Sequence, residues 1–509
     1  MRGPHNLWRL IRTGATLERN DAMGVVLEAF NAPTIIRIAA RGLGKPFKWL
    51  GYKGDPSLPP LLSALDAMGP AYVKLGQILS TRPDVVGEDL SRQLKILQDR
   101  MPPFPREVAI ASVEKELNIR VDDVFSEFSE PVAAASIAQV HYARLRDTGQ
   151  EVAVKVLRPN IERNFRKDFD AFYLGAWVIE TLSPASRRLH PRAVIEHFEG
   201  SVRGELDLRL ESASASEYEA STQGDEGFRV PKMHWKLSDR RVMTLDWAEG
   251  LSCNEIEKID AAGHDRRILA ERILALFLKH ALHNGFFHAD MHQGNIKIAP
   301  DGYVVALDYG IMGRLDAYTR RVYAEILYGF IRKDYRHVAE VHFEAGYVPM
   351  DRDIDEFASA LRAVGEPILG MSAGDISMGR VLSYLFEVTE RFGMETRTEL
   401  IHLQRTMVVV EGVARSLYPD INIWDVARPV VEGYIKQNIG PRALFRDMSR
   451  TLRILSHFGP RLPEIAQTFL AEQQRPQRPP EPPKHAANWL WFVAGAALGA
   501  AMIAGLSRL

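Results

Sequence analysis

The sequence predicts an α+β fold of two lobes, with helical extensions at both ends and one transmembrane helix at the C-terminus. Residues 151–156 (EVAVKV) alternate like a strand, and residues 131–145 predict a strand, a turn and a second strand before it. Residues from about 320 to 470 instead show apolar positions that recur at spacings of three and four, as in helices. These segments predict a small lobe built on a sheet and a larger lobe completed by helices.

The stretch over residues 286–314 (FFHADMHQGNIKIAPDGYVVALDYGIMGR) is the most informative part of the chain. Asp290 stands five residues before Asn295, and Asp308-Tyr309-Gly310 follows an apolar, strand-like run. This is the order of the protein-kinase catalytic loop, H-R-D-x-x-x-x-N, and of the D-F-G segment after it. Phosphoryl transfer needs a carboxylate near the nucleophile and oxygen ligands for Mg²⁺. The pattern therefore predicts a protein-kinase-like fold, with Asp290 in catalysis and Asn295 and Asp308 on the metal.

Two other interpretations of this stretch stay open at the level of sequence. Asp, Asn and Asp-Tyr-Gly are common turn residues between short strands. His288, Asp290 and His292 alternate along an extended segment, so they share a face and also form a candidate metal site.

A lysine and an unusual loop precede this stretch in the sequence. Lys155 stands in EVAVKV where kinases carry the lysine of V-A-I-K. The preceding turn sits where a Gly-rich nucleotide loop is expected, but it contains no glycine. Its predicted nucleotide-binding residues are Ala133, Ala134, Ala135 and Ser136, with Val140 on the strand that follows. Because alanine is penalised at φ > 0 and glycine is not, this loop is not expected to wrap phosphates in the usual way.

The combined motifs resemble the UbiB-type atypical kinase-like family, which is associated with ubiquinone biosynthesis. Besides the alanine loop and HADMHQGN, the chain carries GPAYVKLGQILSTRPDVV over residues 69–86, with the K-x-G-Q motif at Lys74 to Gln77. It also carries E-x-D at Glu205 to Asp207, and Glu211 follows four residues later. The resemblance extends from Leu65 to the 340s. Two positions depart from the pattern: Gln293 replaces a usual proline, and Tyr309 replaces a usual phenylalanine.

The resemblance implies ATP or ADP and Mg²⁺ as cofactors and assigns roles to individual residues. Lys155 is expected to contact the α- and β-phosphates and to pair with a carboxylate on the αC-like helix, for which Glu211 is the choice. Asp290 takes the general-base position. Lys74 and Gln77 are expected on an N-terminal extension folded over the active site, with Lys74 near Glu205 and Asp207; the alternative is an ordinary surface helix with i,i+4 ion pairs. The long segment between Lys155 and Glu211 predicts extra helices in the small lobe.

The predicted domain organisation has five parts. An N-terminal helical extension with the K-x-G-Q motif occupies residues 1–120, and the kinase-like core occupies residues 121–345. The helical remainder of the large lobe covers residues 346–471. A proline-rich linker at residues 472–487 then leads to a transmembrane helix at residues 488–509.

Composition narrows the class of protein. The 509 residues include 64 basic and 65 acidic side chains, so nothing in the net charge of −1 favours nucleic acid. The single cysteine, Cys253, excludes an internal disulfide and is expected to be a packing residue. Residues 7–19 lack the uninterrupted apolar core of a secretory signal, and they predict an amphipathic helix suited to a membrane surface or to the protein itself.

The C-terminal segment favours a membrane anchor. Residues 489–506 carry no charge, Trp489 and Trp491 stand at one end as interfacial anchors, and Gly495 and Gly499 form a small-residue face suited to helix pairing in a homodimer. The resemblance then implies an inner-membrane protein with a cytoplasmic catalytic domain.

The function expected on these grounds is an ATP-binding atypical kinase or ATPase that supports ubiquinone biosynthesis. Its expected partners are ATP, a membrane lipid or quinone precursor, and enzymes of ubiquinone biosynthesis. The alternatives are a protein kinase acting in trans and a nucleotide-binding scaffold without turnover.

Overall fold

The computed structural model describes residues 4–29, 45–80, 87–94, 102–182, 190–370, 384, 387–388, 390–394 and 398–439. The chain forms two compact units, Met1–Lys436 and Gln437–Leu509. The elements below belong to the first unit, apart from the last residues of its final helix. Within the described residues no helix combines the length and apolarity needed to cross a membrane. The predicted linker and membrane span at residues 472–509 lie outside the described residues.

A four-stranded antiparallel sheet forms the small lobe, with the strand order β1-β2-β3-β5. Its strands are β1 (Phe125–Ala134), β2 (Ala138–Leu145), β3 (Glu151–Leu157) and β5 (Val242–Asp246). The alternation in β3 buries Val152, Val154 and Val156 on one face, where they pack with α8 (Arg106–Leu117). Lys155 points to the other face, opposite Val140 of β2. Helix α9 (Val121–Val124) leads into β1.

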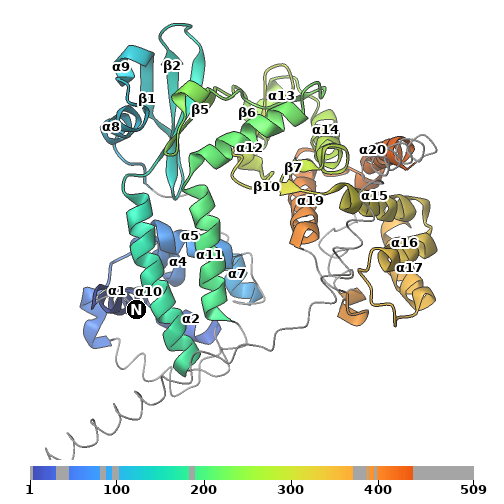
Figure 1. Ribbon diagram of the computed structural model, residues 1–509, viewed down its shortest axis with the longest axis horizontal. Coiled ribbons are helices and arrows are strands. Elements are labelled where there is room, and N and C mark those ends of the chain that lie inside the picture. The colour runs from blue at the N-terminus through green and yellow to red at the C-terminus, as the bar shows by residue number, and fades with distance from the viewer. Residues whose placement is uncertain are drawn as a thin grey trace, which may run out of the picture. The chain divides into compact units, whose positions relative to one another are not determined.

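Three helices follow β3 before the chain returns to the sheet at β5. They are α10 (Ile161–Leu182), α11 (Pro191–Glu205) and α12 (Leu208–Ser221). Asp207 caps the N-terminus of α12 by accepting a hydrogen bond from the backbone N–H of Arg209. Helix α12 contacts β5, and the long helices α10 and α11 lie side by side below the sheet in Figure 1. These two helices are the predicted insertion between Lys155 and Glu211.

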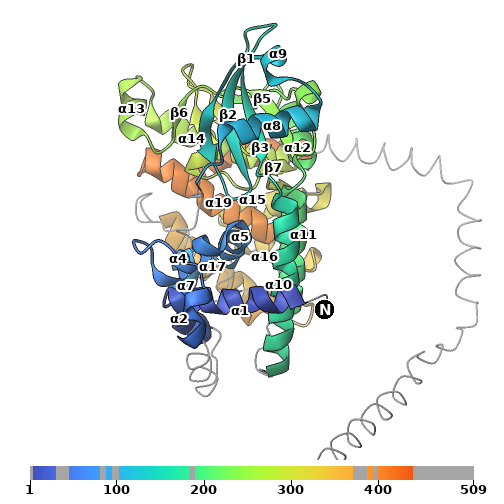
Figure 2. The ribbon, with the colours of Figure 1, turned by 90° about the vertical axis from the view of Figure 1, so that its left-hand side faces the viewer.

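The N-terminal residues fold into short helices against α10. They are α1 (Pro4–Arg19), α2 (Met23–Ala29), the 3₁₀ helix η1 (Lys45–Leu50), α4 (Pro60–Met68), α5 (Pro70–Leu79) and α7 (Glu88–Leu94). Helix α1 crosses α10, and α5 contacts α10 as well (Figure 2). Gly69 separates α4 from α5 with φ of 97°, a value that favours glycine.

The large lobe combines short strands with helices. A sheet of order β4-β9-β8-β6 and a two-stranded ribbon of β10 and β7 carry the loops. The strands are β4 (Phe228–Arg229), β6 (Leu251–Ser252), β7 (Phe286–His288), β8 (Ile296–Ile298), β9 (Val304–Ala306) and β10 (Met312–Arg314). The 3₁₀ turn η6 (Gln293–Asn295) joins β7 to β8, and the π-helical turn η5 (His280–Asn284) precedes β7. A second 3₁₀ turn, η4 (Trp235–Leu237), lies between β4 and β5 of the small lobe.

Helices cover these strands and form most of the buried core. They are α13 (Ile256–Ala261), α14 (Arg266–Lys279), α15 (Ala317–Arg332), α16 (Tyr335–Glu344), α17 (Ile354–Gly370), α19 (Thr398–Leu417) and α20 (Ile423–Asn438). Helix α14 packs against α19, and one continuous hydrophobic cluster joins α14, the catalytic strands and α19. Among the described residues, the helical periodicity predicted after residue 320 corresponds to α15, α16, α17, α19 and α20, and the predicted continuation at residues 440–470 lies outside the described residues.

Candidate active site

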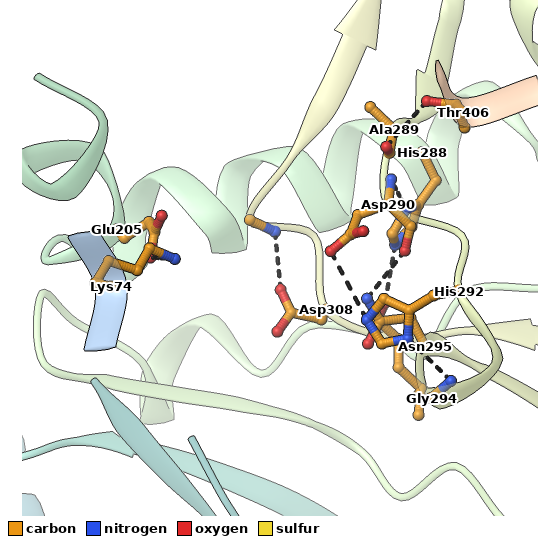
Figure 3. Close-up of polar contacts among 12 residues, drawn as sticks. Lys74, Glu205, His288, Ala289, Asp290, His292, Gly294, Asn295, Asp308 and Thr406 are labelled. Atoms are coloured by element: carbon orange, nitrogen blue, oxygen red, sulfur yellow. Dashed lines mark hydrogen bonds and ion pairs between the residues drawn. The ribbon is translucent and has the colours of Figure 1, made fainter. Parts of the chain in front are cut away.

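The loop after β7 is held in shape by its own side chains (Figure 3). The amide of Asn295 donates from Nδ2 to the carbonyl oxygen of Asp290, at 3.0 Å. His292 caps the turn η6, because its Nδ1 accepts from the backbone N–H of Gly294, at 3.0 Å. The carboxylate of Asp290 is 44% exposed and lies 3.8 Å from His292 Nε2. These contacts leave the Asp290 carboxylate open to an incoming group.

His288 links this loop to the next one. Its Nε2 donates to the carbonyl oxygen of Leu307 at 2.9 Å, and its Nδ1 accepts from the backbone N–H of Asp290 at 3.1 Å. The ring is therefore neutral, and complete burial lowers its pKa. Both nitrogens are occupied, so His288 positions the loop and is not a metal ligand. No group of three or more His, Cys, Asp or Glu suited to a metal occurs among the described residues.

Asp308 stands beside Asn295 after strand β9. The backbone N–H of Leu307 donates to the Asn295 carbonyl at 2.8 Å, which fixes the two segments together. Asp308 has a φ of 55°, a left-handed conformation, and its Oδ1 accepts from the backbone N–H of Gly310 at 3.1 Å. The loss of part of its hydration alone would raise the pKa of Asp308, but the charge of Lys155 and the Gly310 N–H together lower it to about 2. Asp308 is therefore a carboxylate at neutral pH.

Lys155 lies between two carboxylates from distant parts of the chain. Its Nζ is 2.6 Å from Glu211 Oε1 on α12 and 3.3 Å from Asp308 Oδ2. The side chains of Lys155 and Glu211 are only 16% and 10% exposed. Burial opposes the charge on Lys155, but Asp308 and Glu211 more than offset this and raise its pKa. A single cation thus joins β3, α12 and the Asp-Tyr-Gly segment.

The donor set near Asp308 fits a magnesium ion. The amide nitrogen of Asn295 is bonded to Asp290, which leaves the amide oxygen Oδ1 of Asn295 as a free ligand. The Asp308 carboxylate is ionised and half exposed. Oxygen atoms of an amide and a carboxylate are the ligands that Mg²⁺ prefers, alongside phosphate and water.

Comparisons with known proteins identify the family. The ABC1 atypical kinase-like domain model matches residues 96–342, and the UbiB helical domain model matches residues 361–422. A Probable protein kinase UbiB from Pseudomonas paraeruginosa is 35% identical over 501 residues, covering 96% of this chain and 93% of its own. The chain belongs to the UbiB family.

Further UbiB proteins and a solved structure are similar to it. The Probable protein kinase UbiB of Marinobacter nauticus is 38% identical over 414 residues, covering 80% of this chain and 76% of its own. That of Azotobacter vinelandii is 36% identical over 475 residues, covering 92% and 87%. A Mycobacterium tuberculosis protein, solved as the Rv3197-erythromycin complex, aligns with a TM-score of 0.51 at 23% identity. The alignment covers 79% of this chain and 99% of that one, and it shows the shared fold alone.

The alanine loop of this UbiB-family protein is a tight hairpin between β1 and β2. Ala133 and Ala134 pair with Val140 and Gln139, and the backbone N–H of Ala135 donates to the carbonyl of Ala138 at 2.8 Å. None of these residues has a positive φ. Ala133 is exposed, whereas Ser136 is buried at 4% exposure, so the Ser136 side chain is not presented to a ligand.

Arg158 stabilises this hairpin through hydrogen bonds, a role that was not predicted from the sequence. Its Nε and Nη2 donate to the Ala135 carbonyl at 3.1 and 2.9 Å, and its Nη1 donates to the Pro102 carbonyl at 3.0 Å. The buried amide of Gln139 adds bonds to the backbone of Phe104 in both directions. An arginine directly after a strand carries no sequence signal for such a role.

The K-x-G-Q motif lies on α5. Lys74 Nζ is 2.6 Å from Glu205 Oε2 at the end of α11, with both side chains about one-fifth exposed (17% and 20%). Asp207, the other carboxylate of the E-x-D motif, forms its own ion pair with Arg209. Because Asp207 caps α12, its carboxylate is turned to the Arg209 guanidinium, at 2.6 and 2.9 Å. Gln77 is partly buried on the same helix.

Helix α19 supports the catalytic loop from the C-terminal part of the chain. Thr406 Oγ1 donates to the Ala289 carbonyl at 3.0 Å, and the Gln293 amide donates to Ser416 Oγ at 2.8 Å. Gln293, one of the two departures from the family pattern, therefore gains a partner that proline lacks. The other departure, Tyr309, is buried, and its hydroxyl donates to the Ala306 carbonyl. Cys253 is also buried, and burial raises the pKa of its thiol to about 12.

Proposed function

We propose that this protein binds ATP with Mg²⁺ and transfers the terminal phosphoryl group to water or to a small lipid-like acceptor, in support of ubiquinone biosynthesis. The observation that carries the proposal is the position of Lys155, which contacts Glu211 and Asp308 together. This arrangement suits a phosphate-binding lysine held by a helix and placed beside a metal-binding carboxylate.

The remaining roles follow from the geometry of the loop. Asn295 and Asp308 would hold the metal ions, which neutralise charge on the phosphates when bound. Asp290 is the candidate general base, since its carboxylate is accessible and its backbone is held by Asn295 and His288. The alanine hairpin would lie against the nucleotide through Ala133 to Ala135, with Val140 beside Lys155 on the same sheet face.

The acceptor and the setting rest on family membership and on the N-terminal helices. Names of the relatives point to a kinase of the UbiB family. The ion pair between Lys74 and Glu205 ties α5 to the helix that precedes α12. An extension tied there favours water or a small acceptor over a folded protein substrate. We also propose a C-terminal membrane anchor at residues 488–509, which brings the catalytic unit to lipid acceptors.

Phosphate release by the purified full-length protein tests the proposal. With ATP and Mg²⁺, the wild-type protein should release phosphate, and Asp290→Asn should bind ATP but release far less. Assays with and without a quinone-precursor mimic distinguish water from a lipid acceptor. Radiolabel transfer to an added protein would favour the protein-kinase alternative. Nucleotide binding without turnover under every condition would favour the scaffold and contradict the proposal.

Truncation after Gln473 tests the anchor. The shortened protein should remain folded and bind nucleotide, but it should leave the membrane fraction. Persistent membrane binding would assign the attachment to the N-terminal helices instead.

A further inference from the structure

An apolar cavity, partly open to solvent, lies between the N-terminal helices and the inserted helices, and its lining does not include Lys155, Glu211 or Asp308. Its volume is about 280 Å³. Helices α1, α2, α4, α5 and α7 contribute to its wall on one side, and α10 and α11 contribute on the other. Helix α5 contacts α10, and Figures 1 and 2 both show α5 on the side of the α10–α11 pair where α4 also lies. The cavity thus belongs to the seam between the extension and the insertion.

The wall offers almost nothing to a polar ligand. Aliphatic and aromatic side chains such as Leu65, Leu75 and Ile195 dominate it. Its two hydroxyl groups are engaged with each other, because Thr13 Oγ1 and Tyr72 OH lie 2.5 Å apart and Thr13 also donates to the Arg9 carbonyl at 3.0 Å. Burial raises the pKa of Tyr72 to about 12, so the phenol stays neutral. A ligand here would have to be a hydrocarbon.

The size of the cavity separates it from an ordinary packing defect. Protein interiors are packed so closely that voids larger than a water molecule are few. Dry apolar cavities of about 150 Å³ already bind benzene-sized molecules, and this cavity is larger. Small residues of α10 line it: Ala171 and Ala176 are buried in its wall, and Gly175 lies so close to Leu10 that an added Cβ would contact the leucine at 3.4 Å.

We propose that this cavity binds the hydrocarbon chain of a membrane lipid. The same helices connect it to the nucleotide site. Helix α5 lines the cavity with Tyr72 and Leu75 and carries Lys74, which pairs with Glu205 at the end of α11. Helix α11 lines the cavity near its start and leads into α12, which carries Glu211. A chain bound in the cavity therefore acts on α11 and α12, and this link to nucleotide rests on the proposed function.

Photo-crosslinking of the full-length protein tests the site directly. The protein is purified in digitonin, a detergent without a straight alkyl chain, and exposed to diazirine analogues of geranylgeraniol or hexadecanol. The expected labels fall on peptides that contain α5, α10 and α11. Competition with unlabelled geranylgeraniol against hexadecanol distinguishes prenyl from straight chains. Labels confined to other peptides, or no labels at all, overturn the proposal whatever the protein does with ATP.

Matched variants show whether the labelling depends on the cavity. Ala176→Phe fills the cavity and should remove these labels, and Ala171→Leu is a smaller change with the same expected direction. Ala111→Phe places the same side chain on the exposed surface of α8 and should leave the labels unchanged. A thermal shift with ADP and Mg²⁺ checks that each variant is folded. Undiminished labelling in folded Ala176→Phe and Ala171→Leu would refute the site.

If lipid binding and nucleotide binding are linked, each must change the affinity of the protein for the other ligand. ADP with Mg²⁺ should change the extent of labelling in the wild-type protein, because the cavity and the nucleotide act on the same helices. Equal labelling with and without nucleotide would overturn the connection through α11 and α12.

Discussion

Replacing Glu211 with glutamine tests the central ion pair of the site. Glutamine keeps the size of the side chain and its Oε1 acceptor, but it removes the negative charge 2.6 Å from Lys155 Nζ. A hydrogen bond to a charged group contributes about 1.5–3 kcal/mol. Lys155 keeps Asp308 as a second partner at 3.3 Å, so its charge is not left unpaired. We therefore expect the free energy of unfolding to fall by about 1.5–2 kcal/mol, the lower part of that range.

The effect on catalysis should exceed the effect on folding. Without Glu211, Lys155 is drawn to the remaining carboxylate of Asp308 and away from the phosphates. A loss of about 1.4 kcal/mol of transition-state stabilisation lowers kcat/KM about tenfold. We expect at least this loss for ATP hydrolysis by Glu211→Gln. Denaturant unfolding and phosphate release, measured on the same preparation, provide the two numbers.

A matched ion pair outside the site provides the control. Glu162 Oε2 lies 2.6 Å from Arg241 Nη1, with both side chains 23% exposed. Glu162→Gln should lower stability by a similar amount and leave hydrolysis unchanged. If both variants lose stability equally and both keep wild-type kcat/KM, the Lys155–Glu211 pair is structural only, and its assignment to phosphate binding is wrong.

Three further predictions concern the metal, the hairpin and pH. Asp308→Asn should lose most of the thermal shift produced by ADP and Mg²⁺, whereas Asp290→Asn should keep the shift and lose phosphate release; wild-type shifts and hydrolysis in both would contradict the site. Ala135→Gly, at a position just after β1, allows φ > 0 and should change the ratio of ADP to ATP affinity. The change should be stronger when it is combined with Arg158→Ala, which removes the hydrogen bonds to the Ala135 carbonyl. Burial lowers the pKa of His342 to about 4, below its usual 6.5, so its contribution to stability is present above pH 6.5 and is lost as the pH falls toward 4. His342→Gln should therefore show a shallower loss of stability in urea over that range, and an unchanged slope would contradict the assignment.

The chemistry of the site could be predicted from the sequence because its central part is local. Asp290 and Asn295 lie in one short loop, and the Asn295 amide closes that loop on the Asp290 carbonyl. His292 caps the turn between them. Strand β7 pairs directly with β10 across the same stretch. The spacing of these residues along the chain therefore predicted most of the geometry of the catalytic loop.

Contacts between distant segments depended on the tertiary structure. Glu211 lies 56 residues after Lys155 in the sequence. Its assignment as the partner of Lys155 required the family resemblance, because the alternation in β3 does not show which helix faces Lys155. Thr406 and Ser416 reach the catalytic loop across 117 and 123 residues. Asp207 caps α12 and binds Arg209, two contacts that the E-x-D spacing did not predict.

The pattern of apolar and basic residues at positions 7–19 was enough to predict an amphipathic helix, which is present as α1. It did not determine whether the facing side chains meet. Only the packing of α1 and α5 against α10 left a cavity of about 280 Å³ between the N-terminal helices and the α10–α11 pair. The reason is physical: hydrophobicity depends on each residue by itself, whereas the volume between helices depends on the side chains of all of them at once.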